Sequence, residues 1–191
     1  MKIGLYFGSF NPIHSGHLVV ASYMAEFTDL EQVWLMVSPH NPLKPIETLL
    51  QDYHRFALLK VGIGNNSKLK ASDFEFKLSK PNYTIDTLTK LRVQFPLHEF
   101  VMILGTDTLE TFHKWKDFRQ ILDNYELYVY PRSQSTGGDL MIHPQVKKME
   151  APLIEISASF IREAIRNKKD VRYMMPESVW NYIEDMHFYE R

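Results

Sequence analysis

Hydrophobic positions along the chain follow two patterns. Short apolar runs, typical of buried strands, alternate with longer segments in which apolar residues recur every three or four positions, as in helices. The runs predict strands at residues 2–7, 33–38, 68–77 (in one or two pieces), 99–104, 127–130 and 153–156. The helical pattern covers residues 17–27, 49–61, 84–95 with Thr84 as its cap, and 159–167, and Pro176 is expected to open a final helix.

This alternation predicts an α/β fold. We expect a Rossmann-like, doubly wound and mainly parallel sheet with helices on both faces and a small C-terminal helical segment. Ligands of such sheets bind beyond the carboxyl ends of the strands. One site should therefore be surrounded by the loops that follow Phe7, Ser38, Leu104, Tyr130 and Ile156.

Composition narrows the class of protein. The 191 residues, 45% of them hydrophobic, suit one domain over residues 1–191, and the formal net charge of −1 gives no general argument for a nucleic-acid or membrane partner. The chain has no cysteine, which excludes disulfides, thiolate metal sites and a cysteine nucleophile. No apolar run approaches the roughly 20 residues of a membrane span. We therefore expect a cytoplasmic protein, and the sequence leaves open whether it forms a homo-oligomer.

Residues 8–17, with the sequence GSFNPIHSGH, join the first predicted strand to the first helix. Glycine there permits close ligand approach, and the helix N-terminus offers N–H groups to a phosphate. His14 and His17 lie three residues apart, so both can donate hydrogen bonds to phosphate oxygens that gain charge during transfer. Spacing alone does not separate this interpretation from solvated turn histidines or part of a metal site. Neither the Walker sequence nor the Gly-x-Gly-x-x-Gly fingerprint occurs.

Residues 156–162, with the sequence ISASFIR, form a second candidate for phosphate binding. Ser157 and Ser159 can cap a helix start and leave its N–H groups open to phosphate. Arg162 follows Ser159 by three residues and shares its helix face, where a guanidinium can clamp a polyphosphate. In isolation, an ordinary capped surface helix explains this segment better.

Together the two segments resemble the His-x-Gly-His and Ile-Ser-x-(Ser/Thr)-x-x-Arg signatures of the nucleotidyltransferase superfamily. Residues 83–88 (YTIDTL), 104–115 (LGTDTLETFHKW) and the proline-rich loop 39–45 (PHNPLKP) resemble segments of the bacterial nicotinate-nucleotide adenylyltransferases. The resemblance spans nearly the whole chain. In two departures, Asn11 stands where that family usually has Asp, and Leu43 separates Pro42 from Lys44 where a histidine is usual. Asn11 leaves the choice between an acidic and an amidated acceptor base open.

The resemblance implies adenylyl transfer from ATP to nicotinate mononucleotide in NAD biosynthesis, with release of pyrophosphate. It implies His14, His17 and Arg162 as catalytic residues, and a magnesium ion (Mg2+) held mainly by the ATP phosphates. The implied ATP-binding residues are Gly8, Ser9, Phe10, His14, His17, Gly105, Asp107, Ser157, Ser159 and Arg162. The implied acceptor-binding residues are Lys44, Thr84, Trp115, Lys116 and Arg132.

Two alternative functions, and an alternative role for some single residues, stand beside this interpretation. The same chemistry on nicotinamide mononucleotide or phosphopantetheine is the nearest, although phosphopantetheine enzymes usually carry Thr-x-Gly-His where this chain has His14. A non-catalytic nucleotide-binding module that keeps the fold is a rival of another class, but a degenerate site should have lost a histidine or the arginine. For single residues, Trp115 can instead be packing at a helix junction, and Lys44 and Arg132 can be solvated.

Overall fold

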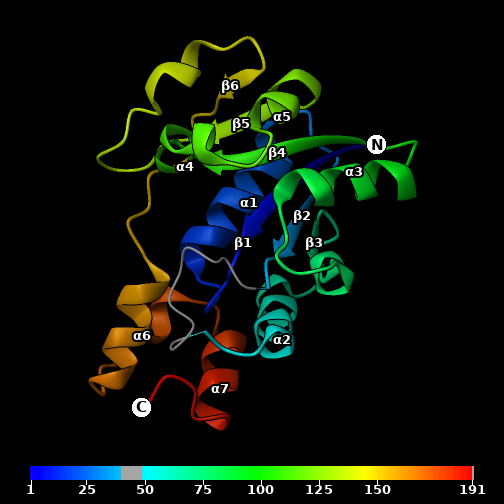
Figure 1. Cartoon of the computed structure of the whole chain (residues 1–191). Coiled ribbons are helices and arrows are strands. Elements are labelled where there is room, and N and C mark those ends of the chain that lie inside the picture. Colours follow the sequence, from blue (N-terminus) through cyan, green and yellow to red (C-terminus); the bar gives the residue numbers. More distant parts are fainter. Residues whose placement is uncertain (40–48, 191) are drawn as a thin grey trace.

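The computed structural model describes residues 1–39 and 49–190 (Figure 1). Its described strands form a six-stranded sheet in the order β3-β2-β1-β4-β5-β6, and every pairing between them is parallel. The strands are β1 Lys2–Gly8, β2 Gln32–Val37, β3 Leu69–Ser72, β4 Glu99–Gly105, β5 Leu127–Tyr130 and β6 Val146–Lys148. The predicted doubly wound, parallel α/β sheet is confirmed.

Helices cover both faces of this sheet (Figure 1). One face carries α1 Ser15–Phe27, α2 Asp52–Ile63, α6 Ala158–Arg166 and α7 Glu177–Asp185. The other carries α3 Thr84–Gln94, α4 Thr106–Glu110 and α5 Phe118–Asn124. Short 3₁₀ turns lie at Phe74–Lys77, Phe112–Lys114, Gly138–Ile142 and Arg172–Met174. Within the described residues, no helix combines the length and the apolar character needed to cross a membrane.

The side chains of β1 show why the strands read as continuous apolar runs. Ile3 and Leu5 are buried among the residues of α3, α4 and α5, whereas Tyr6 is buried with α1, α2, α6 and α7. A strand covered on both faces has no side to leave polar, so the period-two alternation disappears. The apolar runs therefore predicted the central strands well.

The strand order reverses beside β1, and this reversal creates the place for a ligand. From β1 the chain moves outward through β2 and β3, then returns to β4 and moves the other way to β5 and β6. Loops that leave β1 and β4 diverge to opposite faces of the sheet, which leaves a crevice at their carboxyl ends. Residues 8–17 and the start of α4 begin at this crevice.

Two of the predicted strand segments differ in the structure. Of residues 68–77, only Leu69–Ser72 is a strand, and Phe74–Lys77 forms a 3₁₀ turn. The last strand is Val146–Lys148, not residues 153–156, so that prediction is wrong. β6 is an edge strand with two exposed lysines, which suits an edge but weakens its apolar signal. Residues 153–156 have irregular backbone, with Leu153 exposed.

Helix starts and two short helices also depart from expectation. Thr84 is the first residue of α3 and Tyr83 holds the cap position in extended conformation, so the capping role predicted for Thr84 is wrong. Pro176 likewise holds the cap position of α7, which begins one residue later. The sequence pattern missed α4 and α5, because helices of five and seven residues are too short to show a clear period.

A charged cluster joins the amino ends of β1 and β5. Lys2 Nζ lies 2.8 Å from Asp29 Oδ2 and 2.6 Å from Glu126 Oε2, and it donates to the Tyr128 hydroxyl at 3.1 Å. Burial alone would lower the pKa of Lys2, but these hydrogen bonds outweigh it and raise that pKa well above its usual value. Burial would raise the pKa values of Asp29 and Glu126, yet the bonds from Lys2 and its neighbours lower both. The cluster therefore favours the charged forms of all three groups.

We predict that Lys2→Met lowers the free energy of unfolding by about 1 kcal/mol at neutral pH, because it removes the cation shared by the half-buried Glu126 carboxylate and the exposed Asp29 carboxylate, whose pairing is screened by solvent. Since the pKa values of Asp29 and Glu126 are lowered in the folded state, this stability is present above their usual values and is lost as pH falls through the lowered ones. Denaturant unfolding between neutral and acidic pH measures the effect, with the exposed Lys90→Met as control. A deficit that stayed the same at acidic pH would contradict the prediction.

Candidate active site

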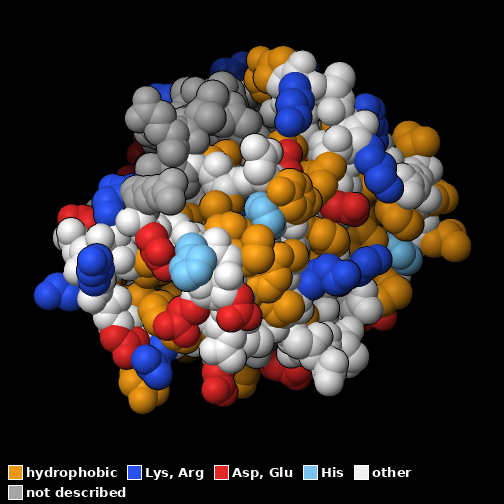
Figure 2. Space-filling model, turned by 90° about the horizontal axis from the view of Figure 1, so that it is seen from below, with side chains coloured by type: hydrophobic (Ala, Val, Ile, Leu, Met, Phe, Trp, Pro, Cys, Tyr) orange, Lys and Arg blue, Asp and Glu red, His pale blue; other side chains and the backbone are white. Residues whose placement is uncertain are grey.

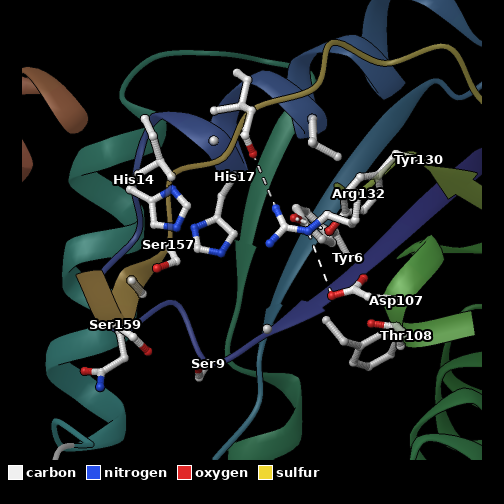
Figure 3. Close-up of a pocket in the computed structure, with 18 of the residues that line it drawn as sticks. Tyr6, Ser9, His14, His17, Asp107, Thr108, Tyr130, Arg132, Ser157 and Ser159 are labelled. Carbon is white, nitrogen blue, oxygen red and sulfur yellow. Dashed lines mark hydrogen bonds and ion pairs between the residues drawn. The ribbon is translucent and has the colours of Figure 1, made fainter. Parts of the chain in front are cut away.

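A cavity of about 540 Å³ lies at the carboxyl ends of β1, β4 and β5 (Figure 3). Its described lining comes from residues 6–20, from Leu49, from residues 107–108 with 130–132, and from residues 152–162. The structure thus brings both predicted phosphate-binding segments to one place, although they lie near opposite ends of the chain. Among the predicted residues, those in the lining are Gly8, Ser9, His14, His17, Asp107, Arg132, Ser157, Ser159 and Arg162.

The chain turns sharply after β1, and Phe10 fills the inside of the turn. Phe10 has a left-handed φ of 44°, and its side chain is only 1% exposed. Its ring lies so close to Gly8 that a Cβ there would be 2.9 Å from it. The ring also meets that of His17 edge-on, with centroids 5.1 Å apart. Phe10 therefore supports the turn and His17 from behind and does not line the described cavity.

His14 and His17 lie side by side at the start of α1, and their rings point into the cavity (Figure 3). The rings stack with centroids 3.8 Å apart. Burial, with a smaller contribution from Arg132, lowers the pKa of His14 to about 4, so this imidazole is neutral at pH 7. Among the described residues, buried His14 Nδ1 has no hydrogen-bond partner. A neutral ring in this position can donate one hydrogen bond to a bound anion.

The start of α6 forms the opposite wall. Ser157 Oγ accepts a hydrogen bond from the Phe160 N–H at 3.1 Å, so the predicted capping by Ser157 is confirmed. One Arg162 amino group donates to the Asn11 carbonyl oxygen at 2.8 Å, and the other donates to Ser159 Oγ at 3.3 Å. Within the described part of the chain, Arg162 Nε is buried without a partner. Arg162 thus links residues 8–17 to the start of α6, and its Nε–H is left to bind a ligand.

Arg132 and Asp107 form a third wall. Arg132 Nε lies 3.9 Å from Asp107 Oδ2, and an Arg132 amino group donates to the Ile154 carbonyl at 3.5 Å (Figure 3). Gly105 does not line the cavity. A Cβ at Gly105 would collide with the Asp107 carboxylate and with the Arg132 side chain, so this glycine gives both of them room.

In the part of the site that the structure describes, positive charge comes from a few individual residues and not from a broad basic surface. On the face shown in Figure 2, lysine and arginine side chains are interspersed with acidic ones. The described lining contains two arginines, Arg132 and Arg162, and one carboxylate, that of Asp107. The cavity is therefore suited to an anion that is held by directed hydrogen bonds.

The residues predicted to bind the acceptor are only partly brought to this cavity. Arg132 lines it, whereas Lys44 lies outside the described residues. Trp115 packs its ring on Phe112, with centroids 5.0 Å apart, which is the packing role weighed as its alternative. Lys116 Nζ lies 3.2 Å from Asp86 Oδ2 and 4.6 Å from the centre of the Tyr83 ring. Thr84 lies between Tyr83 and Asp86 in the sequence, and neither Thr84 nor Lys116 belongs to the described lining.

Arg55 supports the loops of the site through hydrogen bonds to their backbone, and no sequence motif identified this residue. Its side chain is fully buried in α2 and pairs with Asp52 at 2.6 Å. Burial lowers the pKa of Arg55, while Asp52 opposes that shift. The guanidinium donates hydrogen bonds of 2.6 to 3.0 Å to four carbonyl oxygens, those of Ser9, Ser38, Pro39 and Leu50. An arginine among apolar helix residues is usually exposed, so only the structure reveals this role.

Asn11 is also held by contacts that the sequence does not reveal. It is 3% exposed, and its Oδ1 accepts hydrogen bonds from the Leu50 N–H at 3.2 Å and from the Tyr189 hydroxyl at 2.8 Å. Tyr189 lies near the end of the chain. Residues from three distant parts of the sequence therefore meet at Asn11.

Comparison with known proteins agrees with this geometry. The family model described as cytidylyltransferase-like matches residues 5–164. A protein of Flavobacterium psychrophilum is 50% identical, with all of both chains covered, and one of Cytophaga hutchinsonii is 49% identical, with 99% of this chain and 98% of the relative covered. A Bacteroides fragilis protein is 41% identical over 95% of this chain and 90% of its own. Each is named "probable nicotinate-nucleotide adenylyltransferase".

Solved structures share the fold at lower identity. The Plasmodium falciparum nicotinic acid mononucleotide adenylyltransferase complexed with NaAD superposes with a TM-score of 0.83 at 20% identity, covering 99% of this chain and 97% of its own. The same enzyme complexed with APC gives 0.81 at 19% identity, with the same coverage. The likeness of sequence over the full length carries the assignment, and the chain belongs to the cytidylyltransferase-like family and, within it, to the nicotinate-nucleotide adenylyltransferases.

Proposed function

We propose that this protein transfers the adenylyl group of ATP to nicotinate mononucleotide, which yields nicotinate adenine dinucleotide and pyrophosphate in NAD biosynthesis. The observation that carries the proposal is the hydrogen bond from Arg162 to the Asn11 carbonyl, which joins two phosphate-binding segments 151 residues apart around one cavity. The names of the full-length relatives supply the acceptor.

Chemistry of this kind needs positioning more than it needs a protein nucleophile. The acceptor phosphate is already anionic and attacks the α-phosphorus of ATP in line, so the protein mainly holds two anions and offsets charge. His17 is proposed to donate to the α-phosphate, and His14 to hold the triphosphate. The lowered pKa of His14 supports a role as a neutral hydrogen-bond donor and not as a fixed cation.

The departing pyrophosphate would be bound at the start of α6. Ser157 already uses its Oγ as a helix cap, so its contribution would come through the N–H groups at that end. Ser159 can offer its hydroxyl group and Arg162 its guanidinium group to the phosphates. Among the described residues Arg162 Nε has no hydrogen-bond partner, which supports this role. On the ATP side, Gly8 and Ser9 would line the triphosphate, and Asp107 is a candidate for the ribose hydroxyls.

A magnesium ion fits this donor set only if ATP supplies most of its ligands. Among the described residues, no group of three or more His, Cys, Asp or Glu could hold a metal ion, and Asp107 is the only carboxylate in the described lining. Mg2+ commonly keeps several waters and binds substrate phosphates with few protein ligands. When bound, it would neutralise charge on the phosphates that depart.

For the acceptor, we propose that Trp115 stacks on the pyridine ring, and that Thr84 and Lys116 lie near its carboxylate. The contact of Lys116 with Asp86 and the Tyr83 ring supports a shared neighbourhood for Thr84 and Lys116. Lys44 and Arg132 are proposed to bind the phosphate of the mononucleotide. A cytoplasmic location, one domain over residues 1–191 and self-association stay predictions.

We predict that the purified protein releases pyrophosphate when it is given ATP, magnesium and nicotinate mononucleotide, because the cavity and the family both indicate adenylyl transfer. A coupled pyrophosphate assay should show a higher kcat/KM with this acceptor than with nicotinamide mononucleotide or phosphopantetheine. Folded protein without ATP supplies the blank. Absence of release with all three acceptors would refute the proposed function, and a preference for another acceptor would refute its substrate.

We predict that His17→Ala lowers kcat by about 100-fold or more, because it removes a donor aimed at the reacting phosphate. The ring of His17 packs on Phe10 and His14 at the cavity, so circular dichroism and thermal unfolding should accompany the kinetics. His113→Ala, an exposed histidine outside the cavity, is the matched control. Near-normal turnover of folded His17→Ala would remove the role given to this residue.

We predict that the His14 imidazole titrates near pH 4 in the free protein, because burial and Arg132 disfavour its charged form. Bound ATP brings negative charge beside the ring and should raise this pKa. NMR titration of the histidine side chains, with His14→Gln to assign the signal, measures both values. A free-protein pKa near 6.5, or a value that falls when ATP binds, would contradict the electrostatic account.

A further inference from the structure

The end of the chain folds back toward the catalytic segment. After α7 the backbone turns through His187 and Tyr189, which have left-handed φ values of 52° and 67°. The turn is closed by the hydrogen bond from the Phe188 N–H to the Ile183 carbonyl at 3.1 Å, and the Phe188 ring packs on His54 of α2 with centroids 4.7 Å apart. The C-terminal end consequently lies beside α6 and α7 (Figure 1). This packing carries the Tyr189 phenol to Asn11.

Three of the described residues donate hydrogen bonds to Asn11. Its Oδ1 receives the Tyr189 hydroxyl at 2.8 Å and the Leu50 N–H at 3.2 Å, while its carbonyl oxygen receives Arg162 at 2.8 Å. The same residue therefore links the C-terminal turn to the guanidinium that faces the cavity. With so little exposure at Asn11, water is a poor substitute for any one of these donors.

Charges around the phenol favour its role as a donor. Burial raises the pKa of Tyr189 far above neutral pH, although the nearby Arg162 and Arg55 oppose the shift. The hydroxyl thus keeps its proton at every pH at which the protein would work. Its hydrogen bond to Asn11 is therefore a structural contact that does not change with pH in this range.

We propose that Tyr189 is a positioning residue of the catalytic site: its hydroxyl fixes Asn11, and the Asn11 carbonyl in turn aims Arg162 at the phosphates of ATP. The inference rests on the proposed function for the identity of the ligand. Both donors to the Asn11 side chain require an oxygen at that position. An aspartate would present the same oxygen, so Asn11→Asp serves as the conservative variant and Asn11→Ala as the disruptive one.

Tyr189→Phe keeps the ring and removes only the hydroxyl. We expect kcat/KM for ATP to fall about five- to tenfold, as the loss of one buried hydrogen bond predicts, while KM for the acceptor stays within about twofold. Tyr182→Phe is the matched control, because this tyrosine lies in the same C-terminal region and packs on Phe188 by its ring. Unchanged ATP kinetics in a folded Tyr189→Phe, even with a lower melting temperature, would overturn the proposal.

A double-mutant cycle tests whether Tyr189 acts through Asn11. In the Asn11→Ala background, Tyr189→Phe should cause no further fall in kcat/KM for ATP. In the Asn11→Asp background, it should still cause most of the fall that it causes in the wild type. Additive losses in the Asn11→Ala background would overturn the proposed route. Should the wild type turn over no acceptor, the proposed function fails by itself. The cycle is then read from the calorimetric Kd for ATP. In the background that keeps Asn11, the NMR signal of its side-chain amide is a second readout, which Tyr189→Phe must shift and Tyr182→Phe must not.

Discussion

The buried guanidinium of Arg55 is the contact on which the site depends. Loops that leave a parallel sheet at a point of strand reversal turn away from their neighbours, and their carbonyl oxygens lose partners in the sheet. Buried carbonyls without partners are costly, and an arginine offers five N–H donors in a fixed fork. In this protein, Arg55 satisfies the carbonyls of Ser9 after β1, of Ser38 and Pro39 after β2, and of Leu50 before α2. One side chain thereby holds together two segments that leave the sheet and one that leads into α2.

The geometry of the histidines follows from that anchor. Arg55 holds Ser9 from below, and Arg162 holds Asn11 from the side of α6, so both ends of the turn around Phe10 are fixed by cations. The turn then leads directly into α1, where the rings of His14 and His17 stack against each other. This anion site therefore has a cation beneath it, Arg55, as well as two in its described lining, Arg132 and Arg162.

The sequence predicted the sheet and the lining of the cavity better than it predicted the contacts beneath them. Central strands are visible because both of their faces are buried, whereas β6 is an edge strand whose lysines conceal it. The mostly apolar residues 153–156 predict a strand, yet Ile154 and Ile156 line the cavity from irregular backbone. Arg55 and Tyr189 were missed for a common reason. Arg55 binds backbone carbonyl oxygens, and Tyr189 binds the buried side-chain amide of Asn11. Neither kind of contact produces a recognisable spacing of residues in the sequence.

Electrostatics limits how many protons the two histidine rings of the site can carry. Two imidazolium rings 3.8 Å apart would repel each other by about 4 kcal/mol at an effective dielectric constant of about 20, so protonation of both in the empty cavity is strongly disfavoured. Burial and, to a smaller extent, Arg132 lower the pKa of His14 to about 4. The arginines therefore supply the fixed positive charge, and the neutral ring supplies a directed hydrogen bond. An anion as highly charged as a triphosphate should raise the pKa of His14 when it binds, because its negative charge opposes the effects of burial and Arg132, and the ring can donate a hydrogen bond to it in either protonation state.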